Sequence, residues 1–178
     1  EKRLSEYLQV PYLILTSNGT LALQIAYRLL NLKGNVVTTP FSFVATTSSL
    51  VWENIEPIFA DIDPLNFNIS ANNIKMVINP TTSAILGVHV FGNPCDHEKL
   101  KKISNQHKIP IIYDAAHAFG VRLNEKSIAN LGDISIFSFH ATKVFHTIEG
   151  GAVIVNSKEL YDRAKLLINF GISGYDEV

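Results

Sequence analysis

Short apolar runs alternate with segments of helical periodicity along most of the chain. A continuous apolar run bounded by turn residues indicates a buried strand, and apolar positions at a period of 3.6 indicate a helix. The pattern predicts strands at residues 36–39, 56–61, 84–90, 109–114, 134–137 and 152–155. It predicts helices at residues 21–30, 41–52, 70–78, 96–107 and 158–170. Residues 1–15 are ambiguous, with helical spacing first and a candidate strand at 12–15.

Strands that alternate with helices at this spacing are typical of a mostly parallel α/β sheet. In such sheets ligands collect beyond the carboxyl ends of the strands. Asp114 falls at such an end, directly after a fully apolar strand, and His117 follows three residues later. A single acid in that position is seldom a packing residue. We therefore expect a functional role for Asp114 and treat His117 as a second candidate.

The loop from Ser138 to Gly151 joins two apolar runs and contains one lysine, Lys143, among hydroxyls and histidines. Two interpretations of this lysine are open. It is either a surface residue whose amine reaches water, the common fate of lysine, or a pocket nucleophile whose amine is activated by desolvation. His140 and His146 are interpreted as ordinary loop residues.

Two further stretches have two interpretations each. Ser17, Asn18, Gly19 and Thr20 open an apolar helix, so they either only cap it or also form an anion site from the free amides of Gly19 and Thr20 and the Thr20 hydroxyl. The aromatic residues near Phe43, at a strand-to-helix turn, are either core or a flat wall for a ring-shaped ligand. The acids at 61–63 hint at a metal, but a turn explains them better.

Composition narrows the class of protein. The chain has 178 residues, 47% hydrophobic and 17% charged, with a net charge of −1, which fits one domain with a fully covered sheet. It offers no electrostatic footprint for nucleic acid or an anionic membrane. A single cysteine excludes an internal disulfide and favours a reducing, cytoplasmic setting. No apolar run reaches the roughly 18 residues of a membrane span. Because the chain begins at Glu1 and ends just after a helical run, we expect a fragment of a longer protein.

One ligand would use all the candidate groups together, namely pyridoxal 5′-phosphate. Its phosphate needs amide and hydroxyl donors, its pyridine nitrogen needs a carboxylate, and its aldehyde needs a lysine amine. No metal is required, and the absence of a glycine-rich dinucleotide fingerprint disfavours a nicotinamide-dependent enzyme.

The sequence resembles the DegT/DnrJ/EryC1/StrS family of sugar aminotransferases, which have the aspartate-aminotransferase type I fold. The resembling stretches spread over nearly the whole chain in the family's order, at residues 17–20, 40–46, 59–63, 114–117 and 137–143 with 149–151. The resemblance implies a three-layer α/β/α large domain that binds the cofactor and occupies residues 1–178. The family's N-terminal start and small C-terminal domain are then missing.

The resemblance also implies roles for single residues. Lys143 matches the lysine that forms the Schiff base with the cofactor and moves the proton, and Asp114 matches the partner of the pyridine nitrogen. His117 stands where the family places a group near the phenolic oxygen, and Phe43 matches the aromatic that stacks on the ring. The amides of Gly19 and Thr20 and the hydroxyl of Ser138 match the phosphate cradle.

By the same resemblance, the full-length protein is expected to be a homodimer that transaminates a nucleotide-linked keto-deoxy sugar in amino-sugar and cell-surface polysaccharide biosynthesis. Glutamate is the expected donor. Lysine at position 143 favours transamination, because the dehydratases of the family carry histidine there. The residues of the loop, 140–143 and 149–151, are more similar to those of members that act on C4 of the sugar than to those of members that act on C3. A dehydratase or a non-catalytic regulatory relative with the same fold is the alternative.

Overall fold

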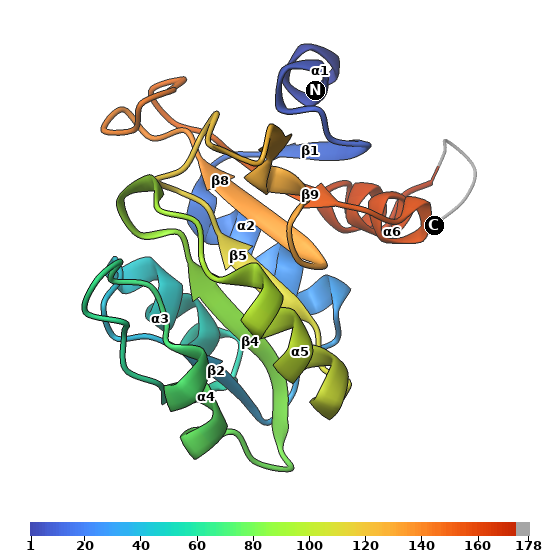
Figure 1. Cartoon of the computed structure of the whole chain (residues 1–178). Helices are drawn as coiled ribbons and strands as arrows, with labels where there is room; N and C mark the ends of the chain where they lie inside the picture. The colour runs from blue at the N-terminus through green and yellow to red at the C-terminus, as the bar shows by residue number, and fades with distance from the viewer. Residues whose placement is uncertain (174–178) are drawn as a thin grey trace.

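A seven-stranded sheet organises residues 1–173, which are the residues that the computed structural model describes (Figure 1). The strand order is β1-β9-β8-β5-β4-β2-β3. The bounds are Tyr12–Thr16 (β1), Asn35–Thr38 (β2), Glu56–Phe59 (β3), Thr82–Val88 (β4), Ile111–Asp114 (β5), Ile134–Ser138 (β8) and Gly151–Val155 (β9). The central strands β2, β5 and β9 are buried at every position, as expected for a sheet that is covered on both faces.

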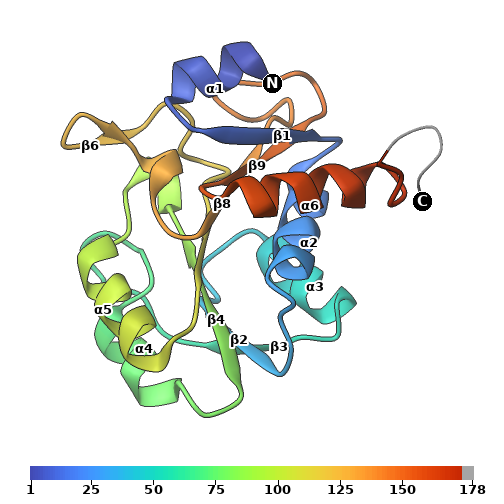
Figure 2. The same ribbon diagram turned by 90° about the vertical axis from the view of Figure 1, so that its right-hand side faces the viewer.

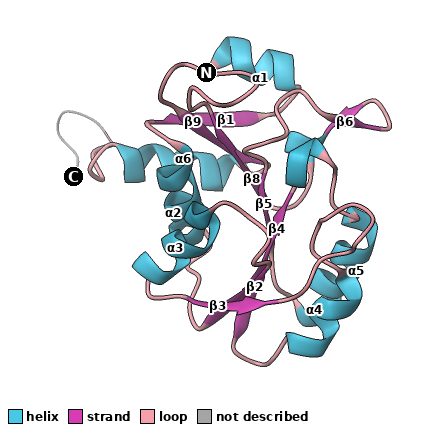
Figure 3. Ribbon diagram, turned by 90° about the vertical axis from the view of Figure 1, so that its left-hand side faces the viewer, coloured by secondary structure: helices cyan, strands magenta, loops and turns pink. Residues whose placement is uncertain are grey.

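Helices cover both faces of this sheet and make three layers, as Figures 2 and 3 show from opposite sides. The helices are α1 (Lys2–Leu8), α2 (Gly19–Leu29), α3 (Val44–Trp52), α4 (Ala71–Val77), α5 (His97–His107) and α6 (Lys158–Ile168). One face packs against α2, α3 and α6 through buried residues such as Leu23, Leu50 and Ala164. The other packs against α4 and α5 through Ile74 and Leu100, and against α1 through Leu8. The predicted α/β fold is therefore confirmed.

Strand β9 is antiparallel to both of its neighbours, β1 and β8, whereas β2, β3, β4, β5 and β8 pair in parallel. Its first residue, Gly151, lies opposite Thr16 of β1 and Ser138 of β8. A Cβ atom on Gly151 would approach the carbonyl carbon and oxygen of Asn18 to 2.6 Å. Glycine at this position thus lets Asn18, the residue that precedes α2, lie against the start of β9.

Several observed bounds differ from the predicted ones; helix α3, for example, begins at Val44 and not at residue 41. Strand β4 ends at Val88 and not at residue 90, because Val90–Gly92 forms a 3₁₀ turn with Phe91 at a φ of 53°. A small hairpin, β6 (Arg122–Leu123) with β7 (Lys126–Ser127), was not predicted. Within residues 1–173, every helix is too short or too polar to cross a membrane.

Candidate active site

A cavity of about 410 Å³ opens at the carboxyl edge of the parallel strands. The loops after β1, β2, β5 and β8 each contribute to its wall, as the topology of such a sheet requires. All seven residues singled out from the sequence line this one cavity: Gly19, Thr20, Phe43, Asp114, His117, Ser138 and Lys143. The structure therefore brings together groups that lie as far apart in the sequence as Gly19 and Lys143.

The start of helix α2 forms one wall. Asn18 is its N-cap, and the Asn18 Oδ1 atom accepts a hydrogen bond of 2.8 Å from the amide of Leu21. Gly19 and Thr20 occupy the first two helical positions, whose amides have no acceptor within the helix. Gly19 lies against Ser138, and Gly19, Thr20 and Ser138 line the cavity at the positive end of the helix dipole. The three residues therefore suit a phosphate group.

Gly19→Ala is expected to disturb this wall, because a Cβ atom at position 19 would lie 2.9 Å from the Cβ of Ser138. Overpacking of this kind costs about 1–3 kcal/mol, so we expect binding of a phosphorylated ligand to weaken about tenfold. Fluorescence titration of pyridoxal phosphate into the full-length protein measures the change. Leu21→Ala, on the same turn but outside the cavity wall, is the control and should bind as the wild type does; equal weakening in both variants would contradict the prediction.

Asp114 is the last residue of β5, and its side chain is buried, with 6% of the residue exposed. The hydroxyl of Thr46 donates a hydrogen bond of 2.8 Å to Asp114 Oδ2, and the amide of Ala116 donates one of 3.1 Å to Oδ1. Burial raises the pKa of the Asp114 carboxyl above its usual value, while these two hydrogen bonds, His117 and Lys143 act in the opposite direction. A cationic ligand group at this carboxylate would relieve the cost of burying its charge.

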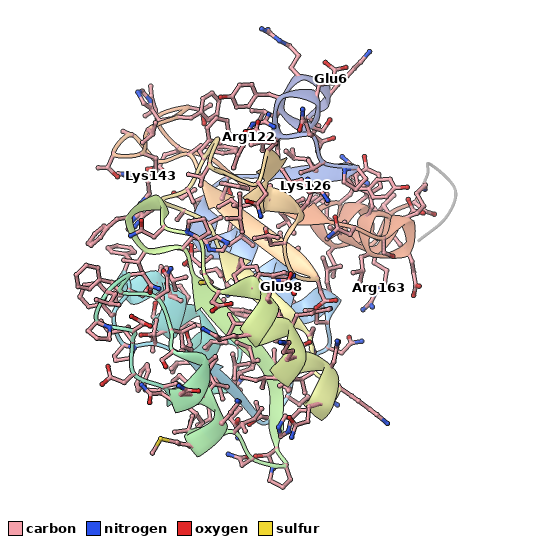
Figure 4. All side chains as sticks on the ribbon, in the orientation of Figure 1. Glu6, Glu98, Arg122, Lys126, Lys143 and Arg163 are labelled. Atoms are coloured by element: carbon pink, nitrogen blue, oxygen red, sulfur yellow. The ribbon has the colours of Figure 1, made fainter. Side chains whose placement is uncertain are left out.

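Lys143 is half-buried in the loop between β8 and β9 and lines the cavity. In Figure 4 the Lys143 side chain lies at some distance from Arg122 and Lys126 of the small hairpin. Its amide donates a 2.9 Å hydrogen bond to the carbonyl of His140. The His140 Nδ1 atom lies 2.9 Å from the hydroxyl of Thr142, and Nε2 lies 3.7 Å from a carboxylate oxygen of Glu149. The loop is thus held by its own side chains, and it places Lys143, half-buried, in the wall of the cavity.

Two rings flank the cavity. Phe43 lines it with 67% of the residue exposed, so the interpretation of this phenylalanine as a core residue is wrong. The His117 ring lies parallel to that of Phe91, with centroids 6.2 Å apart. Partial burial, and then the positive charge of Lys143, lower the pKa of His117, while Asp114 acts in the opposite direction. The lowered pKa of His117 favours its neutral imidazole form.

Sequence reasoning missed several residues of this wall. Ser42, His140, Thr142 and Glu149 also line the cavity, and Thr46 contacts Asp114 from behind it. His140, interpreted from the sequence as an ordinary loop histidine, thus lines the cavity, whereas His146 lies outside the wall. Thr46 is fully buried, whereas Phe43, the residue that precedes α3, is exposed, so the candidate residue at position 43 gave no pointer to Thr46. The acid at position 63 forms a turn, with Asp63 Oδ1 accepting from the amide of Leu65 at 2.9 Å.

The fold and the cavity together define a class of protein. A mostly parallel α/β sheet carries, at its carboxyl edge, a helix start suited to phosphate, a buried carboxylate, a lysine and an aromatic wall. These are the groups of an α/β enzyme that binds a phosphorylated ring-shaped ligand.

The chain belongs to the DegT/DnrJ/EryC1/StrS aminotransferase family, whose model matches residues 1–177. It is 50% identical over 171 residues to a dTDP-4-amino-4,6-dideoxy-D-glucose transaminase of Shigella dysenteriae, which covers 96% of this chain and 47% of that protein. The predicted family is confirmed. The chain spans about half the length of the curated relatives it matches.

Solved structures agree with this assignment. DesI, determined in the presence of its TDP-sugar product, is 37% identical and superposes with a TM-score of 0.94 over 97% of this chain and 44% of that chain. NtdA from Bacillus subtilis, determined with bound cofactor PMP, is 31% identical and superposes with a TM-score of 0.92 over 99% of this chain and 41% of that chain.

Proposed function

We propose that the full-length protein is a pyridoxal-phosphate-dependent aminotransferase that transfers an amino group from glutamate to a nucleotide-linked keto-deoxy sugar. The observation that carries this proposal is the convergence of Lys143, Asp114 and the start of α2 on one cavity. The chain itself is proposed to be the large, cofactor-binding domain. The names of its relatives, which include a dTDP-4-amino-4,6-dideoxy-D-glucose transaminase, support a 4-keto-6-deoxy sugar as the acceptor.

The cavity wall fits pyridoxal phosphate group by group. Gly19 leaves room for the backbone to approach Ser138, where a Cβ atom would clash, and the amides at this helix start suit the phosphate. Asp114 offers a buried carboxylate that gains from a cationic partner, as the ring nitrogen would be. Phe43 presents an exposed aromatic face for stacking. When bound there, the cofactor would supply an electron sink for charge that develops at the Cα atom of the donor.

The residues of the chain then have separate tasks. Gly19, Thr20 and Ser138 hold the phosphate, and Phe43 and His117 fix the plane of the ring. Asp114 keeps the ring nitrogen protonated, which requires the carboxylate to be ionised. Lys143 holds the cofactor and moves the proton at the donor Cα, a general acid–base role in which the amine must change its protonation state. The neutral imidazole of His117 can serve as a hydrogen-bond partner for the ring without adding charge.

The homodimer implied by the family is supported by apolar rings left exposed at the same edge of the sheet, including Phe91 at 69%, since contiguous exposed apolar residues mark interaction surfaces. A cytoplasmic role in the synthesis of amino sugars for cell-surface polysaccharides is supported by the single, unpaired Cys95.

Incubation of the full-length protein with a 4-keto-6-deoxy sugar nucleotide, glutamate and pyridoxal phosphate tests the function. We expect 2-oxoglutarate and an aminated sugar in equal amounts, measured by a coupled assay and by mass spectrometry. A deoxygenated sugar without 2-oxoglutarate would assign the protein to the dehydratases. Binding of the cofactor without any turnover, on a panel of keto sugars with different nucleotides, would favour the non-catalytic relative.

A further inference from the structure

We propose that Ser42 and Thr46 are positioning residues that hold the Asp114 carboxylate in one orientation through a chain of two hydroxyl hydrogen bonds. Only the catalytic consequence of this positioning, the pairing of Asp114 with the ring nitrogen of the cofactor, rests on the proposed function. The chain of hydrogen bonds itself belongs to the protein without ligand.

The carboxylate of Asp114 decides the direction of both hydrogen bonds. Thr46 Oγ1 lies 2.8 Å from Asp114 Oδ2, and Ser42 Oγ lies 2.6 Å from Thr46 Oγ1. An ionised carboxylate only accepts hydrogen bonds, so Thr46 donates its single hydroxyl proton to Asp114. The Thr46 oxygen then accepts the proton of Ser42. The two hydroxyls therefore point the same way, from the cavity wall toward the carboxylate, and each polarises the next.

The second carboxylate oxygen is also held. Asp114 Oδ1 accepts the 3.1 Å hydrogen bond from the amide of Ala116, which belongs to the turn after β5. The hydroxyl of Thr46 in α3 holds Oδ2, and the amide of Ala116 in the turn after β5 holds Oδ1. The plane of the carboxyl group is therefore fixed by two different elements. Ser42 lines the cavity, whereas Thr46 is fully buried. The carboxyl group is thus kept from rotating, and its remaining lone pairs face the cavity in a fixed orientation.

A merely structural role for Thr46 would be to dock the first turn of α3 onto the sheet. The alternatives differ in what they predict for Asp114 itself. A hydrogen bond to the ionised form lowers the pKa of a carboxyl, and burial here acts in the opposite direction. Removal of the Thr46 hydroxyl is thus expected to raise the pKa of Asp114 further, whereas a docking role leaves it unchanged. Lys143, His117 and the phenol of Tyr27 also face this carboxyl, and they are the same in every variant.

The test is titration of the full-length protein without cofactor, with ¹³C-labelled aspartate, by NMR. Thr46→Val keeps the shape and removes the hydroxyl, and we expect Asp114 to titrate at higher pH than in the wild type. Thr46→Ser restores the donor and should restore the wild-type titration. Thr38→Val is the matched control, because Thr38 is also buried but donates to the carbonyl of Leu86 at 3.0 Å. The Asp114 titration should not move in this variant.

Binding of pyridoxal phosphate by the same proteins gives the second measurement. We expect about tenfold weaker binding in Thr46→Val and recovery in Thr46→Ser, the order of magnitude of a hydrogen bond to a charged group. Ser42→Ala, which leaves Thr46 in place, should shift the Asp114 titration in the same direction by less, and it serves if Thr46→Val does not fold. An unchanged Asp114 titration in both Thr46→Val and Ser42→Ala, or an equal shift in Thr38→Val, would overturn the inference. Failure of the proposed aminotransferase function would leave the NMR result unaffected.

Discussion

Lys143→Ala should abolish transamination while leaving the fold intact. Lys143 lies on a loop and is half-buried, so its truncation removes no core volume. The amine has two tasks in the proposed reaction, to hold the cofactor and to move the proton at the donor Cα, and general acid–base groups alone contribute up to about 10⁴-fold. We expect kcat to fall by on the order of 10⁴-fold, measured as 2-oxoglutarate release by the full-length protein.

A second measurement separates the loss of chemistry from the loss of cofactor. Borohydride reduction of the wild-type holoenzyme, followed by peptide mass mapping, should attach the cofactor to Lys143. The variant should show no attachment and an unchanged thermal unfolding midpoint without cofactor. Lys126→Ala, on the exposed hairpin away from the cavity, is the control and should behave as the wild type. Retained turnover in Lys143→Ala would refute the assignment of this lysine.

Asp114→Asn is the second large effect. Asparagine matches the shape of aspartate but carries no charge, so it cannot keep the ring nitrogen of the cofactor protonated. We expect kcat to fall about 10²- to 10³-fold, the scale on which removal of one preorganised electrostatic partner acts. The dissociation constant of the cofactor should rise by less than tenfold, because the phosphate cradle and the aromatic wall are untouched.

The contrast between kcat and cofactor affinity is the informative quantity. Asp133→Asn is a matched control: Asp133 Oδ2 accepts a 2.8 Å hydrogen bond from the amide of Ile111, at the opposite end of β5. That substitution keeps an acceptor oxygen and should leave turnover unchanged. Equal losses of kcat and of cofactor binding in Asp114→Asn would mean that Asp114 is a structural acid.

Much of the fold could be predicted because the local and global signals agree. Strands β5 and β9 are buried at every position, and apart from Asp114 and Gly151 they consist of aliphatic and aromatic residues. Helices such as α5 carry clear caps, here Asp96, which accepts from the amide of Lys99. The direction of β9 was not predictable from its residues. An apolar run buried on both faces reads the same in either direction, and only its pairing with β1 and β8 sets the orientation.

Other misses have local causes. The β6–β7 hairpin turns at Asn124 and Glu125, which have φ values of 50° and 63°. Two-residue turns of this kind favour Asn-Gly, and glutamate in the second position hides the signal. Within the cavity, the reactive residues that follow a strand directly, as Asp114 does, could be predicted from the sequence. The hydrogen bond from Thr46 to Asp114 could not be predicted, because it depends on which helix packs against which strand. No pattern within α3 alone indicates that packing.

The cavity wall has a consequence for stability as well as for catalysis. Its residues come from the loops after four different strands, from the start of α2 to the turn at Glu149, so no single segment of the chain can form the binding site by itself. A ligand that binds only the completed wall stabilises the native state as a whole, by about 2.7 kcal/mol at a concentration of one hundred times its dissociation constant. The cofactor would then slow hydrogen exchange in strands on both sides of the sheet's centre, far from any atom it touches. In the cell, its supply would set how much of the protein survives proteolysis as well as how much is active.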